Sequence, residues 1–156
     1  LRLRPRRGPR RLPAERFRPT PSSERLIAHQ LRHLIPMTTP ALLLAYAGCD
    51  TCRKARSWLD ASAIPFELRP IVEQPPTVDE LRRWIAASGV PLRRWLNTSG
   101  QSYRALGKAR VDAATDDELI GWLAADGKLV KRPVLVRDGT VLVGFRPEAW
   151  ETALQG

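Results

Sequence analysis

Apolar and polar positions change their spacing several times along the chain after residue 40. Leu42–Tyr46 is an unbroken apolar run, which predicts a strand buried on both faces. A turn follows at Gly48–Thr51, and Cys52–Ala61 has the apolar spacing of a helix that buries one face. Phe66–Val72 predicts a second strand, which Pro70 interrupts. The pattern therefore begins as strand, helix, strand.

A helical insertion is predicted next, over about residues 77–125. Thr77 and Glu80 have the spacing of a capping box, which predicts the start of an amphipathic helix. A short helix is expected over Pro91–Leu96 and a longer one over Thr115–Ala124. These helices form an insertion between two groups of strands.

Two further strands are predicted over Val134–Arg137 and Val141–Gly144, because the Asp138-Gly139 pair between them is a strong hairpin signal. A helix over Pro147–Leu154 completes the order. A β-α-β unit requires a parallel crossover, whereas the hairpin adds antiparallel strands to the same sheet. The sequence thus predicts an α/β, thioredoxin-like fold, with a mixed four-stranded sheet and an inserted helical subdomain.

Charge is distributed unevenly along the 156 residues, whose net charge is +10. Residues 1–36 contain ten Arg and two acidic residues, while the remainder contains 16 basic and 14 acidic residues. A DNA-reading face on the domain at 37–156 is therefore not expected, and no direct contact with nucleic acid is predicted for it. The Arg- and Pro-rich composition predicts disorder over residues 1–36. Because Met37 is the only Met, this segment is also interpreted as an extension upstream of the native start. An arm that touches RNA or a membrane and a transit peptide remain alternatives.

The apolar runs and the cysteines indicate a cytoplasmic protein without a membrane partner, expected to be a monomer. No run approaches the roughly 20 apolar residues that a membrane-spanning helix needs. The only two cysteines stand in one four-residue motif, unlike those of a secreted disulfide scaffold. In a reducing cytosol such pairs are usually catalytic, sensing or metal-binding.

Cys49 and Cys52 stand where the first strand turns into the first helix, and they are the predicted redox-active centre. A helix N-terminus offers unpaired N–H groups and partial positive charge, which stabilise a thiolate. Cys49 is therefore predicted to be the nucleophile, and Cys52, one turn later, the thiol that resolves a mixed disulfide. Arg53, Lys54 and Arg56 add positive charge beside the pair.

The sequence gives less support to other functions of the two cysteines and of the residues around them. Zinc needs four ligands, whereas the motif supplies two, and residues 37–156 contain no histidine, so no metal site is predicted. The lack of histidine also excludes Ser-His and Cys-His catalysis within the domain. Two buried structural cysteines remain an alternative. The adjacent Arg93 and Arg94 are interpreted as a solvated basic face.

Four segments occur in an order that identifies a family: CDTCRKARSWLD, NTSGQSYRALG, LVKRPVLV and GFRPEAW. Together they resemble the arsenate reductase family of the thioredoxin superfamily, to which the Spx-like regulators also belong, over about residues 41–154. The resemblance implies that Cys49 attacks the substrate and that Arg132 helps to bind an oxyanion or to stabilise the thiolate. It also implies that Pro133 is a cis-proline beside the reactive sulfur. The predicted substrate-binding residues are Thr51, Arg53, Asn97, Pro133 and Arg146.

The chain also departs from the arsenate reductase pattern. Asn97 stands where glutaredoxin-dependent arsenate reductases usually carry an arginine, and an asparagine lacks that residue's bidentate oxyanion contact. Cys52 and the RKARSWLD segment are closer to the Spx-like regulators, which bind the RNA polymerase alpha subunit. We therefore expect a thiol–disulfide oxidoreductase with no bound cofactor, restored by an external thiol (glutathione, glutaredoxin or thioredoxin). The alternatives are a redox-sensing regulator that binds RNA polymerase, and an oxidoreductase-like scaffold without a substrate of its own.

Overall fold

Four short strands form one mixed sheet in the spatial order β2-β1-β3-β4. β1 (Ala41–Ala45) pairs in parallel with β2 (Phe66–Pro70) and antiparallel with β3 (Val134–Arg137). β3 then turns into the antiparallel β4 (Thr140–Val143) through Asp138-Gly139, where both residues have positive φ. The predicted sheet and hairpin are therefore confirmed.

The computed structural model describes residues 39–155. The extension predicted over residues 1–36, together with Met37, lies outside the described residues. Within the described part, no helix has the length and hydrophobicity that crossing a membrane would require. In the same part, no three His, Cys, Asp or Glu side chains lie close enough together to hold a metal ion.

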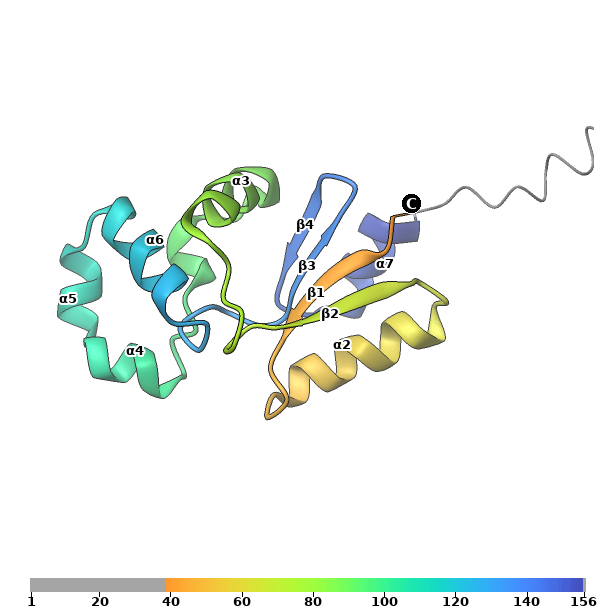
Figure 1. Ribbon diagram of the computed structural model, residues 1–156, viewed down its shortest axis with the longest axis horizontal. Helices are drawn as coiled ribbons and strands as arrows, with labels where there is room; N and C mark the ends of the chain where they lie inside the picture. Colours follow the sequence, from red (N-terminus) through yellow and green to blue (C-terminus); the bar gives the residue numbers. More distant parts are fainter. Residues whose placement is uncertain (1–38, 156) are drawn as a thin grey trace, which may run out of the picture. The chain divides into compact units, whose positions relative to one another are not determined.

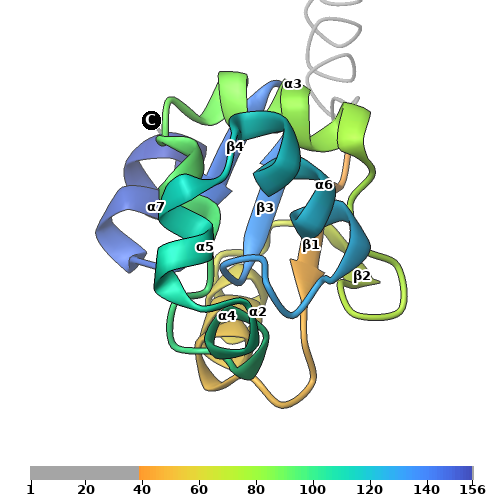
Figure 2. The same cartoon turned by 90° about the vertical axis from the view of Figure 1, so that its left-hand side faces the viewer.

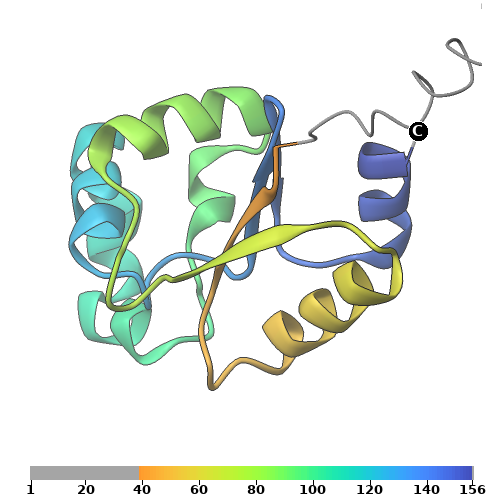
Figure 3. The ribbon, with the colours of Figure 1, turned by 45° about the vertical axis from the view of Figure 1, so that its right-hand side comes forward.

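Helices cover both faces of the sheet, as Figures 1 and 3 show. Two helices pack on one face, and the helices inserted between β2 and β3 pack on the other, so the predicted helical subdomain is confirmed. The helices are α2 (Asp50–Ala61), α3 (Val78–Ser88), η1 (Leu92–Trp95, a 3-10 helix), α4 (Gln101–Leu106), α5 (Lys108–Ala113), α6 (Asp116–Ala125) and α7 (Pro147–Gln155).

Neighbouring residues of the central strand contribute to two different hydrophobic clusters. Leu43 packs with Leu59 of α2 and Trp150 of α7 on one face of the sheet. Leu44 packs on the other face with residues of the helical subdomain, among them Trp84 of α3. This alternation follows from the period of two in a strand, and it explains why β1 is apolar at every position.

Local capping explains where the longer inserted helices begin. Thr77 and Glu80 form the predicted capping box, in which Glu80 N–H donates to Thr77 Oγ1 at 3.2 Å and Thr77 N–H donates to Glu80 Oε2 at 2.8 Å. Thr115 and Glu118 form a second capping box at the start of α6. The short helices α4 and α5, which belong to the group of inserted helices that faces the viewer in Figure 2, have no side-chain cap and were not predicted as separate helices.

A close backbone approach joins the helical subdomain to the sheet. A Cβ atom placed on Gly127 would lie 1.8 Å from the carbonyl oxygen of Ile71, so only glycine fits there. Beyond this contact, Leu96 and Val130 form an isolated antiparallel bridge, and Lys131 N–H donates to the Trp95 carbonyl at 2.7 Å. The segment that leads into β3 is therefore held against the end of η1.

Candidate functional site

The turn after β1 places the two cysteines at the beginning of α2. Cys49 has an extended backbone and is the N-cap of the helix, so its Sγ accepts a hydrogen bond from Cys52 N–H at 3.2 Å. Cys52 lies one helical turn later and packs in the hydrophobic cluster with Ala55 and Leu59. Both cysteines are free thiols, Cys49 partly exposed and Cys52 only 1% exposed. The Cys52 thiol donates to Cys49 Sγ at 2.6 Å.

The two thiols differ in their environment, and this difference separates their roles. Burial and the hydrogen bond to Cys49 raise the pKa of Cys52 to about 12, although a backbone hydrogen bond with Tyr46 and the charge of Arg132 oppose the increase. Cys52 is therefore protonated near neutral pH while its partner is in contact with solvent. The sulfur of Cys49, partly exposed at the helix N-terminus, is suited to attack a substrate, and the buried sulfur of Cys52 is suited to attack Cys49 in a second step.

Arg132 lies close enough to the dithiol for its charge to act on the pKa of Cys52, which it lowers. The Arg132–Pro133 peptide bond is cis, as the resemblance implied. The guanidinium group of Arg132 lies over the ring of Tyr46, 4.9 Å from the ring centroid. The backbone carbonyl of the same tyrosine accepts from Cys49 N–H at 3.2 Å. Tyr46 thus connects the arginine to the turn that carries the cysteines.

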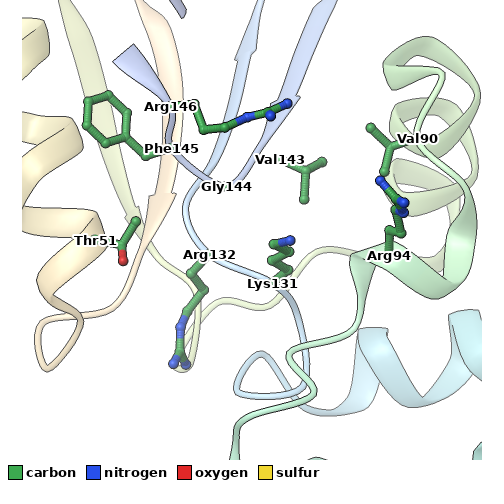
Figure 4. Close-up of a pocket in the computed structure, with 9 residues that line it drawn as sticks. All are labelled: Thr51, Val90, Arg94, Lys131, Arg132, Val143, Gly144, Phe145 and Arg146. Atoms are coloured by element: carbon green, nitrogen blue, oxygen red, sulfur yellow. The ribbon is translucent and has the colours of Figure 1, made fainter. Parts of the chain in front are cut away.

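A cavity of about 430 Å³ opens beside the start of α2 (Figure 4). Four of the lining side chains are cationic and none is a carboxylate. Among the described residues, none of these four cations forms an ion pair. The cavity is thus suited to an anion. The lining residues are Thr51, Val90, Arg94, Lys131, Arg132, Val143, Gly144, Phe145 and Arg146.

The structure brings some of the predicted substrate-binding residues together and separates others. Thr51, Arg132 and Arg146 line the cavity, and Pro133 follows Arg132 directly. Arg53 is exposed, forms an ion pair with Asp50 and does not line this cavity.

Asn97 also lies outside the cavity lining, in the joint between the helical subdomain and the segment before β3. Its side-chain amide donates to the Lys128 carbonyl at 3.2 Å, and its backbone N–H donates to the Leu129 carbonyl at 2.7 Å. The geometry thus gives Asn97 a structural contact at the position where the resemblance implied a substrate contact.

Two cations of the cavity, Arg94 and Lys131, were not among the predicted site residues. Arg93 and Arg94 are both exposed, as the solvated face predicted, but the side chain of Arg93 also donates to the carbonyls of Val111 at 2.7 Å and Ala114 at 3.1 Å. Arg94 is exposed but lines the cavity. Lys131 directly precedes Arg132 within the recognised LVKRPVLV segment, and that position is the one signal in the sequence that pointed to it.

Comparisons with known proteins agree with this architecture. The model of the ArsC family matches residues 44–153. The uncharacterized protein YusI of Bacillus subtilis is 39% identical over 107 residues, which are 68% of this chain and 91% of YusI. The regulatory protein MgsR of the same organism is 29% identical over 103 residues, 66% of this chain and 81% of MgsR.

Solved structures are similar as well. The crystal structure of an ArsC family related protein from Bacteroides fragilis has a TM-score of 0.71 and 44% identity, and the match covers 74% of this chain and 98% of that one. This likeness confirms the thioredoxin-like fold that the order of strands and helices predicted.

Proposed function

Because the chain belongs to the ArsC family, we propose that it is a thiol–disulfide oxidoreductase that reduces an oxidised substrate with Cys49 and Cys52. The observation that carries the proposal is the arrangement of the two free thiols. One is partly exposed at a helix N-terminus, and the other is buried with its thiol in contact with the first sulfur. Such a pair is suited to exchange through a mixed disulfide that the second thiol resolves.

The proposed reaction has two exchange steps. The Cys49 thiolate attacks one sulfur of a disulfide substrate, which forms a mixed disulfide and releases the other half as a thiolate. Cys52 then loses its proton and attacks Cys49 Sγ, which closes the protein disulfide and releases the second half. Two electrons pass from the protein to the substrate. The positive charge of Arg132 favours the second step, because it opposes the raised pKa of Cys52.

Arsenate is a second substrate to be tested. Thr51, Arg132 and Arg146 would bind its oxygens, and Cys49 would form a sulfur–arsenic bond with loss of water. Attack of Cys52 on Cys49 Sγ would then release arsenite and leave the protein disulfide. In either case an external thiol from the thioredoxin, glutaredoxin or glutathione systems of a reducing cytoplasm would restore the dithiol.

Turnover assays test this proposal. The full chain is assayed with arsenate and with a chromogenic disulfide, each in the presence of thioredoxin and of glutaredoxin. Cys49→Ser is expected to abolish turnover, whereas Cys52→Ser is expected to stop at a mixed disulfide that mass spectrometry detects. Ser57→Ala, an exposed change on the same helix, serves as the control. Full reductase activity in the Cys49→Ser variant would rule out the proposal.

The similarity to the regulatory protein MgsR favours a second candidate, a redox-sensing regulator. Its partner would be the RNA polymerase alpha subunit, as the resemblance to the Spx-like regulators implies. In this case the Cys49–Cys52 disulfide would change binding, and turnover would not be required. Pull-down of purified alpha subunit by the oxidised and by the reduced chain separates the two candidates. If neither the oxidised nor the reduced chain bound the alpha subunit, the regulator hypothesis would be ruled out.

A further inference from the structure

The cavity beside the dithiol carries more positive charge than one compact oxyanion needs. Arg94, Lys131, Arg132 and Arg146 line it without any carboxylate. In residues 39–155 these side chains form no ion pair that would neutralise them. Grouped like charges repel one another, and an anion that enters the group relieves the repulsion. The charge of the site therefore favours a ligand with more than one negative group.

The cations lie on two sides of the cavity. Figure 4 shows Arg132 on the side of Thr51 and α2, and Arg94 on the opposite side, where η1 follows α3. The hydrogen bond from Lys131 N–H to the Trp95 carbonyl, at 2.7 Å, fixes Lys131 beside the residue that follows Arg94. Lys131 directly precedes Arg132, and its side chain lies between those of Arg132 and Arg94 in Figure 4.

The size and the walls of the cavity also favour an extended ligand. Its volume of about 430 Å³ lies within the range of roughly 300–1,000 Å³ that is usual for small-molecule sites. Val90, Val143 and Phe145 add apolar surface to the cationic lining. A tetrahedral oxyanion held by Thr51 and Arg132 would leave Arg94 without a partner.

Resting on the oxidoreductase function proposed above, we propose that the substrate is a small disulfide with an acidic group at each end. One acidic group pairs with Arg132 near the dithiol, Arg94 binds the other, and Lys131 lies between the two. Arg94 is then a specificity-determining residue, and it supplies from η1 a guanidinium that Asn97 does not provide. The exchange steps are those already given, so the protein dithiol is oxidised, the disulfide is reduced to two thiols, and no further reactant is required.

Two chromogenic disulfides of similar size test the proposal by single turnover of the reduced chain. Dithiobis(nitrobenzoate) carries two carboxylates, and dithiodipyridine carries none. A charge-assisted hydrogen bond contributes about 1.5–3 kcal/mol, so Arg94→Gln and Lys131→Gln are each expected to lower the ratio of the two rates about tenfold or more. Arg83→Gln removes an exposed arginine of α3 that does not line the cavity and should leave the ratio unchanged.

A binding measurement without turnover completes the test. Calorimetric titration of the Cys49→Ser variant with azobenzene dicarboxylate and with benzoate should show tighter binding of the dianion, and Arg94→Gln should remove the difference. Equal affinities, or an unchanged rate ratio in a chain that reduces both disulfides, would overturn the second subsite and leave the oxidoreductase intact. A wild-type chain that reduces neither disulfide would overturn the oxidoreductase and the substrate assignment together, even if the dianion binds.

Discussion

Replacement of Gly127 by alanine is expected to weaken the joint between the helical subdomain and the sheet. The new Cβ would lie 1.8 Å from the Ile71 carbonyl oxygen, whereas real Cβ contacts essentially never fall below 3.0 Å, so the two backbones must separate by at least about 1.2 Å. Neither side can yield easily. Ile71 is fully buried, and its N–H donates to the Ala45 carbonyl at the end of β1 at 3.0 Å.

The cost follows from these contacts. Overpacking a well-packed site costs about 1–3 kcal/mol, and loss of the hydrogen bond from Ile71 adds about 1 kcal/mol. Gly127→Ala should therefore lower the free energy of unfolding by about 2–4 kcal/mol. Gly121→Ala is the matched control, because this exposed glycine lies inside α6 with nothing within 4 Å of the added Cβ. It should stabilise the protein by about 0.5–1 kcal/mol.

Urea denaturation of both variants and of the wild type, followed by far-ultraviolet circular dichroism, measures these differences. The two identical substitutions should change stability with opposite sign. A Gly127→Ala protein within about 0.5 kcal/mol of the wild type would refute the argument, because it would show that the joint has room to relax. Since the same segment leads to Arg132, slower reaction of the destabilised variant with anionic disulfides is also expected.

Three further substitutions can be tested by denaturation. Partial burial raises the pKa of Glu80, but hydrogen bonds, chiefly from Arg69, outweigh this effect, so the pKa is lowered overall. The carboxylate therefore stabilises the fold fully above its ordinary pKa of 4.5, and this stabilisation is lost as the pH falls through the lowered value. Glu80→Gln should cost about 1 kcal/mol at pH 7 and less at pH 3. The pKa of about 12 for Cys52 predicts that the reduced protein loses stability above pH 9, where the unfolded thiol ionises and the buried one does not. Cys52→Ala should not show this loss of stability at high pH. An equal dependence of the unfolding free energy on pH in both proteins would contradict the prediction. Trp150→Phe should cost about 2–3 kcal/mol, because it leaves a gap and removes the indole donor that bonds the Gly144 carbonyl at 3.0 Å; an unchanged urea midpoint would contradict it.

Elements with strong local signals were predictable from the sequence. Thr77 and Glu80 carry the capping box within one turn, and Asp138-Gly139 can adopt the positive φ values that its hairpin requires. The helices α4 and α5 follow Gly100 and Gly107, which offer no capping side chain, and each is only six residues long. Packing against the rest of the subdomain determines such helices more than their own sequence does.

Some residues of the candidate site were likewise predictable from the sequence, and others were not. The cysteine pair and Arg132 stand in recognisable segments, and the structure places them together. Arg93 and Arg94 are chemically identical neighbours, and what distinguishes them is distant along the chain. The carbonyls at the end of α5 accept the side chain of Arg93 and leave Arg94 to line the cavity. No local pattern could assign these two roles.

The insertion of the helices between β2 and β3 has a consequence for how a domain of this kind can diversify. Cys49 lies in the turn between β1 and α2 and Cys52 in the first turn of α2, whereas Arg94 belongs to the insertion. With Arg94 in the role proposed for it, substitutions in η1 would exchange one substrate for another without disturbing the strand order or the dithiol. Two such proteins can keep the same cysteine pair and the same cis-proline yet act on different compounds. We therefore expect differences within η1 to be a better guide to divergence in substrate than identity around the cysteines.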